Sequence, residues 1–279
     1  MQQFFFHTAA ALTRVMPWLS LDRLPLSVPS GEHIIRWRGH SRVHIDLAHA
    51  RERELYRQGR YEPHICALLD ELPAGAVAVD AGANTGWLTL ILSARAGASG
   101  RVYAFEPNAA VRARLEANLA LNPHASNVTV LPQALGDQDG IAQLYLPPVD
   151  TITGRASLSH HPQDWQPVEV PLTTLDAALP DLPRLDLLKV DVEGHDLLVL
   201  RGALRLISAY HPRILIEYDA ASWHSSGVSY EDLLALLRPM NYEVFQIPRY
   251  RLRGLLRPAL RPLPDLPPSH AEQIGRAHV

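Results

Sequence analysis

The chain has 279 residues, of which 47% are hydrophobic and 20% charged, and this composition is typical of a globular protein with a sizeable core. Its formal net charge of −3 argues against nucleic acid or an anionic membrane as a partner attracted by a global field. The single cysteine, Cys66, excludes an internal disulfide and a cysteine-rich zinc site.

The first 21 residues are fairly apolar but are interrupted by His7, Arg14 and Pro17. They lack the basic start of a signal peptide, and no run reaches the roughly 18 apolar residues of a membrane span. We therefore expect a short amphipathic helix here, no membrane span, and a cytoplasmic protein.

Residues 1–75 predict an N-terminal appendage with a hairpin, over 33–38 and 42–47, followed by a helix. From residue 76 to 248, apolar strand-like runs alternate with amphipathic helical segments. The expected strands are Val77–Asp80, Val102–Glu106, Val128–Leu131, Leu185–Val192, Arg213–Tyr218 and Tyr242–Ile247. The expected helices are Leu88–Arg95, Ala110–Leu121, His195–Ser208 and Tyr230–Arg238. This alternation predicts an α/β domain with a doubly wound, mostly parallel sheet.

Residues 137–182 interrupt the alternation with two extended runs, Gln143–Leu146 and Val168–Leu172. We expect a β-rich insertion over the carboxyl ends of the strands, where open α/β sheets bind ligands. Its polar side chains, among them His160, His161 and Trp165, are candidates for an acceptor pocket or are simply solvated.

Residues 249–279 read as an irregular tail rich in proline and arginine. The last six residues, Ile274–Val279, resemble one reading frame of a sequencing adapter. We therefore exclude them from the fold and expect the natural C-terminus to be missing.

A glycine turn follows the first strand of the domain, in the sequence Asp80-Ala81-Gly82-Ala83-Asn84-Thr85-Gly86. Glycines permit a tight turn and let backbone amides approach a ligand. A nicotinamide fingerprint would also need glycines where Asn84 and Trp87 stand. Asp80 would repel a pyrophosphate, but it would attract the ammonium and sulfonium groups of S-adenosylmethionine. The turn therefore predicts S-adenosylmethionine as the cofactor, with a purely structural turn as the alternative.

The next strand ends in Glu106-Pro107, about twenty residues after the turn. From this position a carboxylate accepts hydrogen bonds from both ribose hydroxyls of a nucleotide-like ligand. Pro107 cannot extend the strand, so it fixes where Glu106 points.

A second polar cluster, Asp191, Glu193 and His195, follows the strand that we expect beside the donor strand. A positioned Asp, Glu or His can remove the proton of a hydroxyl during methyl transfer, so these three are the candidate catalytic residues. Capping of the following helix by Asp191 or Glu193 is the structural alternative. Lys189 within the strand would need an acidic partner, and Asp191 or Glu217 could supply it. We expect no metal, because a clear third ligand is missing.

Several further motifs accompany these residues in a fixed order. They are Gly59-Arg60-Tyr61-Glu62, Phe105-Glu106-Pro107-Asn108, Ala134-Leu135-Gly136-Asp137, Leu172-Thr173-Thr174-Leu175-Asp176, Lys189-Val190-Asp191-Val192-Glu193-Gly194 and Leu200-Arg201-Gly202-Ala203. Together with the glycine turn they resemble the FkbM family of methyltransferases, from about residue 44 to 247.

The resemblance implies a class I, Rossmann-like methyltransferase fold and transfer to a hydroxyl of a small molecule, such as a sugar or a polyketide. It also implies that Gln133 and Ala134 lie near the adenine and that Tyr61 and Glu62 close over the donor or acceptor. The family ends with an antiparallel strand inserted between two others, which we expect this chain to lack.

Two other functions remain open from the residues alone: an NAD(P)-binding oxidoreductase and a non-catalytic binding module on the same fold. The run Asp191-Val192-Glu193-Gly194 stands where amino-methylating enzymes often carry an Asn-Pro-Pro-Tyr type loop, which favours oxygen as the acceptor atom. The sequence indicates neither the identity of the acceptor nor the oligomeric state.

Overall fold

The computed structural model of the chain describes residues 30–39, 41–147, 156–158, 164–247, 261–262 and 274–278, the last two segments as backbone only. The chain divides between Leu68 and Leu69 into two compact units. The expected N-terminal helix and most of the tail lie outside the described residues, and the domain boundaries expected from the sequence stay a prediction. No helix in the described part of the chain is long and apolar enough to cross a membrane.

The first unit contains the expected hairpin. Strand β1 (Glu32–Trp37) pairs antiparallel with β2 (Ser41–Asp46). Helix α2 (Ala50–Gln58) follows and ends at Gly59, whose left-handed backbone (φ 64°) favours glycine. Helix α3 (Pro63–Leu69) then leads into the second unit.

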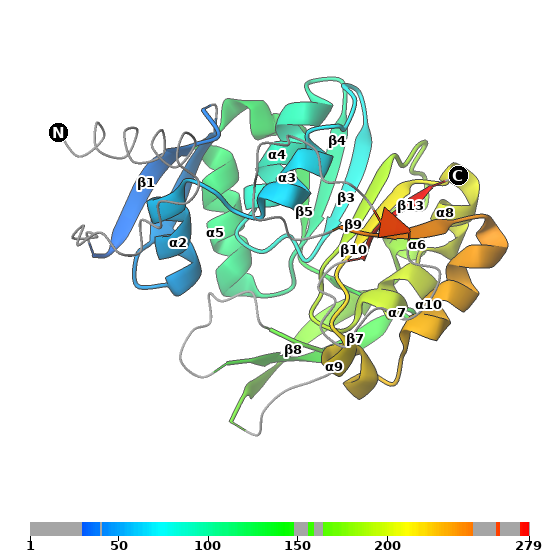
Figure 1. The fold of residues 1–279 in the computed structure, drawn as a ribbon. Helices are drawn as coiled ribbons and strands as arrows, with labels where there is room; N and C mark the ends of the chain where they lie inside the picture. The colour runs from blue at the N-terminus through cyan, green and yellow to red at the C-terminus, as the bar shows by residue number, and fades with distance from the viewer. Residues whose placement is uncertain are drawn as a thin grey trace. The chain divides into compact units, whose positions relative to one another are not determined.

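The second unit is built on a sheet with the strand order β12-β11-β13-β10-β9-β3-β4-β5 (Figure 1). Its strands are β3 (Val77–Ala81), β4 (Arg101–Phe105), β5 (Val128–Leu131), β9 (Leu187–Val190), β10 (Arg213–Ile216), β11 (Glu243–Gln246), β12 (Arg261–Pro262) and β13 (Ile274–His278). The five strands from β10 to β5 are parallel, and β3 and β9 are buried along their whole length, as expected for strands covered on both faces. This confirms the predicted doubly wound α/β fold.

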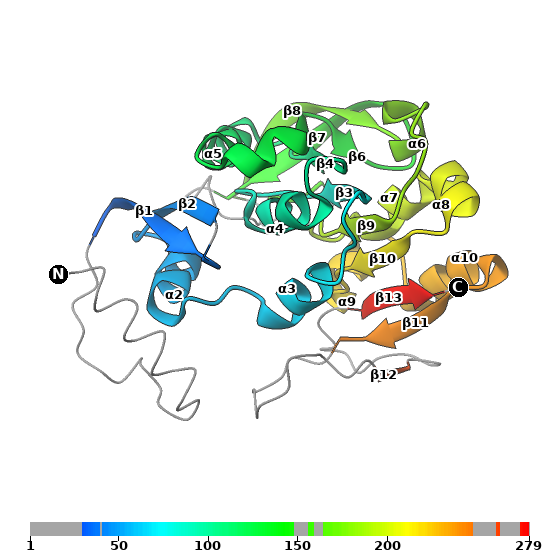
Figure 2. The same ribbon diagram turned by 90° about the horizontal axis from the view of Figure 1, so that it is seen from above.

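Helices cover both faces of this sheet (Figure 2). Its helices are α4 (Trp87–Ala96), α5 (Ala109–Ala120), η2 (Pro123–Asn127), α6 (Leu175–Ala178), α7 (Asp196–Arg201), α8 (Leu204–Tyr210), α9 (Ala220–Ser225), α10 (Tyr230–Leu237) and η3 (Arg238–Met240). On one face, Val79 and Val190 join a core with side chains of α7, α8 and α10. On the other, Ala104 packs with Leu115 of α5. Alternate residues of each strand therefore face different helix layers.

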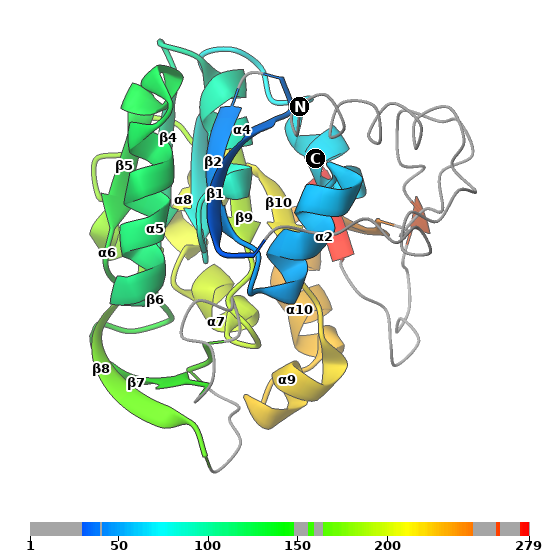
Figure 3. The ribbon, with the colours of Figure 1, turned by 90° about the vertical axis from the view of Figure 1, so that its left-hand side faces the viewer.

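A three-stranded sheet forms the expected insertion, in the order β6 (Ala134–Leu135), β8 (Gln166–Thr173) and β7 (Gly140–Leu146). The β7–β8 ribbon lies at the same end of the unit as α7 and α9 (Figures 1 and 3). This end is where the parallel strands terminate.

The helix expected over residues 195–208 is wrong as a single element. Helix α7 ends at Arg201 and α8 begins at Leu204. A Cβ on Gly202 would lie only 1.9 Å from the carbonyl oxygen of Gly136, so glycine permits a close backbone contact at the break.

The expected absence of the last strand is also wrong. Strand β13 runs antiparallel between β10 and β11, pairing Leu215 with Gly275 and Val244 with Ala277. Sheet hydrogen bonds are made by the backbone, so a segment with an unusual sequence can occupy this place. The prediction rested on the identity of these residues, whereas main-chain hydrogen bonds between strands do not depend on a particular side chain.

Candidate active site

The turn after β3 contains three left-handed residues. Gly82, Asn84 and Gly86 have φ angles of 75°, 51° and 85°. Asparagine tolerates this conformation because its side chain bonds locally, and here Asn84 Oδ1 accepts a hydrogen bond from the Thr85 N–H at 2.7 Å. Asn84 thus makes the bend at a position where a dinucleotide turn carries glycine.

The two glycines of this turn serve close packing inside the protein. A Cβ on Gly82 would lie 1.9 Å from the carbonyl oxygen of Asp191, and one on Gly86 would lie 2.3 Å from Leu115 Cδ1. From the sequence we expected these glycines to let a ligand approach the backbone. In the structure, the missing side chain of Gly82 also allows the turn after β3 to contact the turn after β9.

Glu106 lies at the carboxyl end of β4 and is 8% exposed. Its two oxygens accept hydrogen bonds from the N–H groups of Asn84 and Asn108, each at 2.9 Å. Burial raises its pKa to about 7, against these two hydrogen bonds. Arg112 Nη1 donates to the carbonyls of Glu106 and Pro107, which fixes the strand end. Each carboxyl oxygen keeps one acceptor site for a hydroxyl group.

Gln133 and Ala134 continue the same edge, at the start of β6. Gln133 Oε1 is buried, and no described residue donates a hydrogen bond to it. A buried acceptor of this kind is costly unless a ligand donor meets it. Ala83 and Ala134 are buried small residues. These residues fit S-adenosylmethionine, whose ribose hydroxyls and adenine amino group supply such donors.

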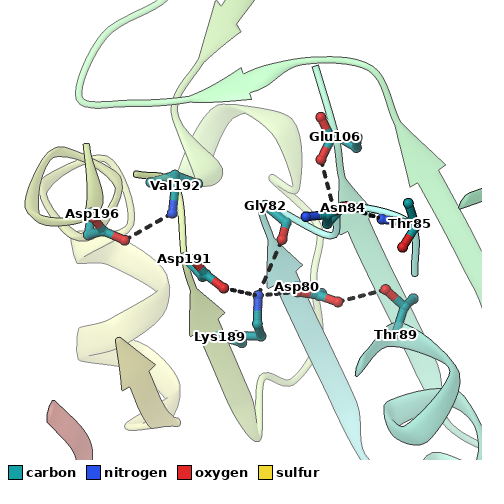
Figure 4. Close-up of polar contacts among 10 residues, drawn as sticks. All are labelled: Asp80, Gly82, Asn84, Thr85, Thr89, Glu106, Lys189, Asp191, Val192 and Asp196. Atoms are coloured by element: carbon teal, nitrogen blue, oxygen red, sulfur yellow. Dashed lines mark hydrogen bonds and ion pairs between the residues drawn. The ribbon is translucent and has the colours of Figure 1, made fainter. Parts of the chain in front are cut away.

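Asp80 is fully buried, and its carboxylate is engaged inside the protein (Figure 4). Oδ2 accepts from Thr89 Oγ1 at 2.6 Å, and Oδ1 lies 3.0 Å from Lys189 Nζ. The sequence suggested Asp191 or Glu217 as the partner of this lysine and missed Asp80. A contact between Asp80 and the donor stays a prediction, and it would compete with these two partners.

The turn after β9 carries the candidate catalytic residues. Glu193 and Gly194 are left-handed, with φ angles of 53° and 97°. Asp196 holds this turn: its oxygens accept from the N–H groups of Val192 and Gly194, each at 3.0 Å. Burial raises the pKa of Asp196 to about 7. Asp196 belongs to the polar cluster after the predicted strand but had no predicted role, although an acid in the first turn of a helix is a known capping signal.

Asp191 and Glu217 meet at the carboxyl ends of β9 and β10. The Asp191 side chain is 32% exposed and its Oδ2 lies 3.5 Å from Lys189 Nζ. The negative charge of Asp191 and burial raise the pKa of Glu217 far above its ordinary value, and the two side chains are hydrogen-bonded to each other. The contact therefore disfavours the state in which both carboxyl groups are ionised.

Three further residues of the candidate site, His195, Ser157 and Glu62, belong to separate segments of the chain. His195 is half-buried with its Nε2 only 3.1 Å from where a Cβ on Gly136 would lie, and burial lowers its pKa. Ser157 is buried and donates to the Glu193 carbonyl at 3.0 Å, which anchors the insertion on the turn after β9. Glu62 belongs to the first unit, with a φ of 37°, and its contact with the donor stays a prediction.

Two further expectations concern ligands. His160 and His161 lie outside the described residues. Within the described ranges, no group of three or more His, Cys, Asp or Glu side chains is arranged to hold a metal ion.

Comparison with known proteins gives a consistent family. The Methyltransferase FkbM domain matches residues 80–244. Methyltransferase sdnD of Sordaria araneosa is 29% identical over 208 residues, covering 64% of this chain and 78% of that protein. The AMB antimetabolite synthetase AmbE of Pseudomonas aeruginosa is 28% identical over 277 residues, covering 86% of this chain, which spans only 12% of that protein.

Among solved structures, Methyltransferase FkbM from Methylobacillus flagellatus is 18% identical with a TM-score of 0.47, covering 81% of this chain and 52% of that one. The domain match spans more than half of the chain and includes the glycine turn, Glu106 and the Asp191 cluster. It favours neither the oxidoreductase nor the non-catalytic module. The chain therefore belongs to the FkbM methyltransferase family, and it is an S-adenosylmethionine-dependent methyltransferase.

Proposed function

We propose that this enzyme methylates a hydroxyl oxygen of a small molecule, with Asp191 as the general base. The observation that carries the proposal is the Asp191–Glu217 pair: two carboxyl groups in contact, of which Asp191 is partly exposed and lies 3.5 Å from Lys189 Nζ, directly beside the turn after β3. Hydroxyl oxygens are weak nucleophiles while they keep their proton, so a base at this edge of the sheet suits oxygen methylation.

The donor would be held by residues of the neighbouring strand ends. Glu106 would accept hydrogen bonds from the ribose hydroxyls, and Gln133 Oε1 would accept one from the adenine amino group. The turn of Gly82, Asn84 and Gly86 would surround the rest of the donor. When bound, S-adenosylmethionine supplies the electrophilic methyl group.

Glu217 keeps the proposed base in a single charge state. Two ionised carboxylates in contact repel strongly, which favours a pair that retains one proton, and we assign this proton to Glu217, the more buried partner. Asp191 is thus left ionised and can take the proton of an acceptor hydroxyl. We place Glu193 and His195 second as bases, because Glu193 lies in the strained turn and the His195 ring faces the Gly136 backbone.

The family and its relatives support the proposed class of acceptor. We propose a sugar or glycan hydroxyl, or a hydroxyl of a polyketide-like natural product. The similarity to a segment of an antimetabolite synthetase supports a small-molecule acceptor. The insertion, anchored on the Glu193 carbonyl by Ser157, would form part of its pocket.

The test uses S-adenosylmethionine labelled with ¹³C in the methyl group. The enzyme is incubated with a hydroxyl panel (methyl glycosides and hydroxylated macrolactones) and with a matched amine panel (the corresponding amino sugars and amino macrolactones). We expect labelled methoxyl carbons in the hydroxyl panel, identified by NMR. Label on nitrogen instead, or on no compound of either panel, contradicts the proposal.

The role of Asp191 is tested separately with the best acceptor. Asp191→Asn should lower kcat by roughly 10²- to 10⁴-fold and leave the affinity for S-adenosylhomocysteine nearly unchanged. Asp181→Asn is the matched control, because Asp181 is an exposed acid between α6 and β9. A full loss in both variants, or in neither, would remove Asp191 from this role.

A further inference from the structure

A lysine inside the sheet is the most unusual polar residue of this enzyme. Lys189 lies in β9 and is 4% exposed. Its backbone partner across the parallel pair is Asp80 of β3, so the two side chains lie on the same face of the sheet. A buried ammonium is costly, and proteins keep one only where it is paired and hydrogen-bonded.

Lys189 Nζ contacts three oxygens at the carboxyl ends of β3 and β9 (Figure 4). It lies 3.0 Å from Asp80 Oδ1 and 3.5 Å from Asp191 Oδ2, and it donates to the Gly82 carbonyl at 3.3 Å. Asp80 lies in β3 and Gly82 in the donor turn that follows it, Gly82–Gly86, whereas Asp191 begins the turn after β9. The lysine is therefore a direct link between the part that holds the donor and the proposed base.

The two turns also touch through their backbones at the same place. A Cβ on Gly82 would lie 1.9 Å from the Asp191 carbonyl oxygen, and the Asp191 N–H donates to the Ala81 carbonyl at 3.1 Å. Small displacements of one turn are therefore transmitted to the other. An ammonium that bonds to both fixes their separation.

We propose that Lys189 is a positioning residue for methyl transfer, which holds the donor turn against Asp191 and keeps the Asp191 carboxylate ionised. The inference rests on the proposed role of Asp191 as the base. The lysine acts through Asp191 and Gly82 rather than on the acceptor itself.

The charges around Asp191 explain why a cation is needed there. The titratable groups near this aspartate include Asp80, Glu193, Asp196 and Glu217. All of these are carboxyl groups, and each ionised one favours the protonated form of Asp191. The ammonium of Lys189, 3.5 Å from Asp191 Oδ2, opposes them.

The alternative role for Lys189 is only to neutralise the buried carboxylate of Asp80, the residue opposite it in β3. In that case, removing both charges together would leave Asp191 as it was. In the proposed role, Asp191 would still lose the ammonium at 3.5 Å.

The experiment therefore compares the unmodified enzyme with the double variant Asp80→Asn/Lys189→Met. The double variant avoids the uncompensated buried charge that Lys189→Met alone would leave. The amide oxygen that replaces the carboxylate of Asp80 can still accept the hydrogen bond of the Thr89 hydroxyl. The titration of Asp191 is followed by NMR of ¹³Cγ-labelled aspartate, with the Asp191 signal assigned from its loss in Asp191→Asn. This measurement needs no acceptor.

We expect the proton affinity of Asp191 to rise by roughly tenfold or more in the double variant. With the best acceptor, the acid limb of the kcat profile should move to higher pH by the same amount. The matched control is Glu71→Gln/Arg213→Met, which removes an ion pair of 3.6 Å elsewhere in the same unit and should move neither quantity.

An unchanged Asp191 titration in a folded double variant that binds S-adenosylhomocysteine normally would overturn the inference and leave Lys189 as a counter-ion of Asp80. Lys189→Arg should keep the titration close to that of the unmodified enzyme. Failure of the proposed function is seen independently, as full activity of Asp191→Asn.

Discussion

The contact between the two turns of the site can be tested by a single methyl group. Gly82→Ala would place a Cβ 1.9 Å from the Asp191 carbonyl oxygen, although real Cβ contacts stay above 3.0 Å, so the turns must separate by about 1.1 Å. Overpacking of this kind costs about 1–3 kcal/mol. The left-handed backbone at φ 75° adds about 1–2 kcal/mol for alanine. The free energy of unfolding should therefore fall by about 2–5 kcal/mol.

The assay combines thermal unfolding with turnover. A loss of this size corresponds to a decrease in Tm of roughly 4–20 °C for a unit of this length. A shift of about 1 Å between the donor turn and Asp191 should also lower kcat by up to about 100-fold. The control is Gly227→Ala, because Gly227 has nearly the same φ, 72°, and a Cβ there meets no atom within 4 Å. Equal losses of stability in the two variants, or normal kcat in Gly82→Ala, would refute the reasoning.

Three further predictions concern single side chains. Glu106→Gln should weaken S-adenosylhomocysteine binding by about tenfold or more. In the unmodified enzyme the affinity for this ligand should fall as the pH drops below about 7, where Glu106 takes up a proton. Calorimetry from about pH 5.5 to 8.5 checks both expectations. The folded-state pKa of Asp196 is raised to about 7 from 3.8, so between about pH 4 and 7 the folded protein binds more protons than the unfolded chain, and this residue should make the free energy of unfolding fall as the pH rises. Denaturant unfolding at several pH values should show a weaker pH dependence of this free energy for Asp196→Asn. An unchanged pH dependence contradicts the assignment. Ser157→Ala removes the hydrogen bond to the Glu193 carbonyl, which should lower the free energy of unfolding by about 1 kcal/mol. In steady-state kinetics the KM of the acceptor should rise while the affinity for the donor stays the same. A change in donor binding alone would contradict the role of Ser157 as an anchor.

Much of the site was predictable because its signals are local in the chain. The glycine turn at 82–86 and the acid Glu106 one strand later are read from short spacings, and the structure brings Glu106 to the Asn84 N–H at 2.9 Å. The alternation of apolar runs also predicted the parallel sheet, since buried strands and amphipathic helices differ in period. Errors at the strand ends stayed within two residues in this sheet, whereas β7 of the insertion begins three residues before the predicted start.

Other features could not be predicted, because they depend on which strands pair and in what register. Asp80 and Lys189 are 109 residues apart in the chain, and only the register of β3 against β9 makes them partners. The break between α7 and α8 arises where Gly202 meets the distant backbone of Gly136. The place of β13 was missed because main-chain pairing does not require a particular sequence.

The fold class and the family were readable from the sequence alone, because they rest on local periodicity and on motifs in a fixed order, and the same motifs predicted the candidate donor turn with Glu106. The tertiary structure decided which charges meet: Lys189 with Asp80 and Asp191, Glu217 with Asp191, and Asp196 with the turn after β9. The physical reason is that a carboxyl group takes its proton affinity from burial and from its nearest charges, and the packing of strands distant in the chain sets both.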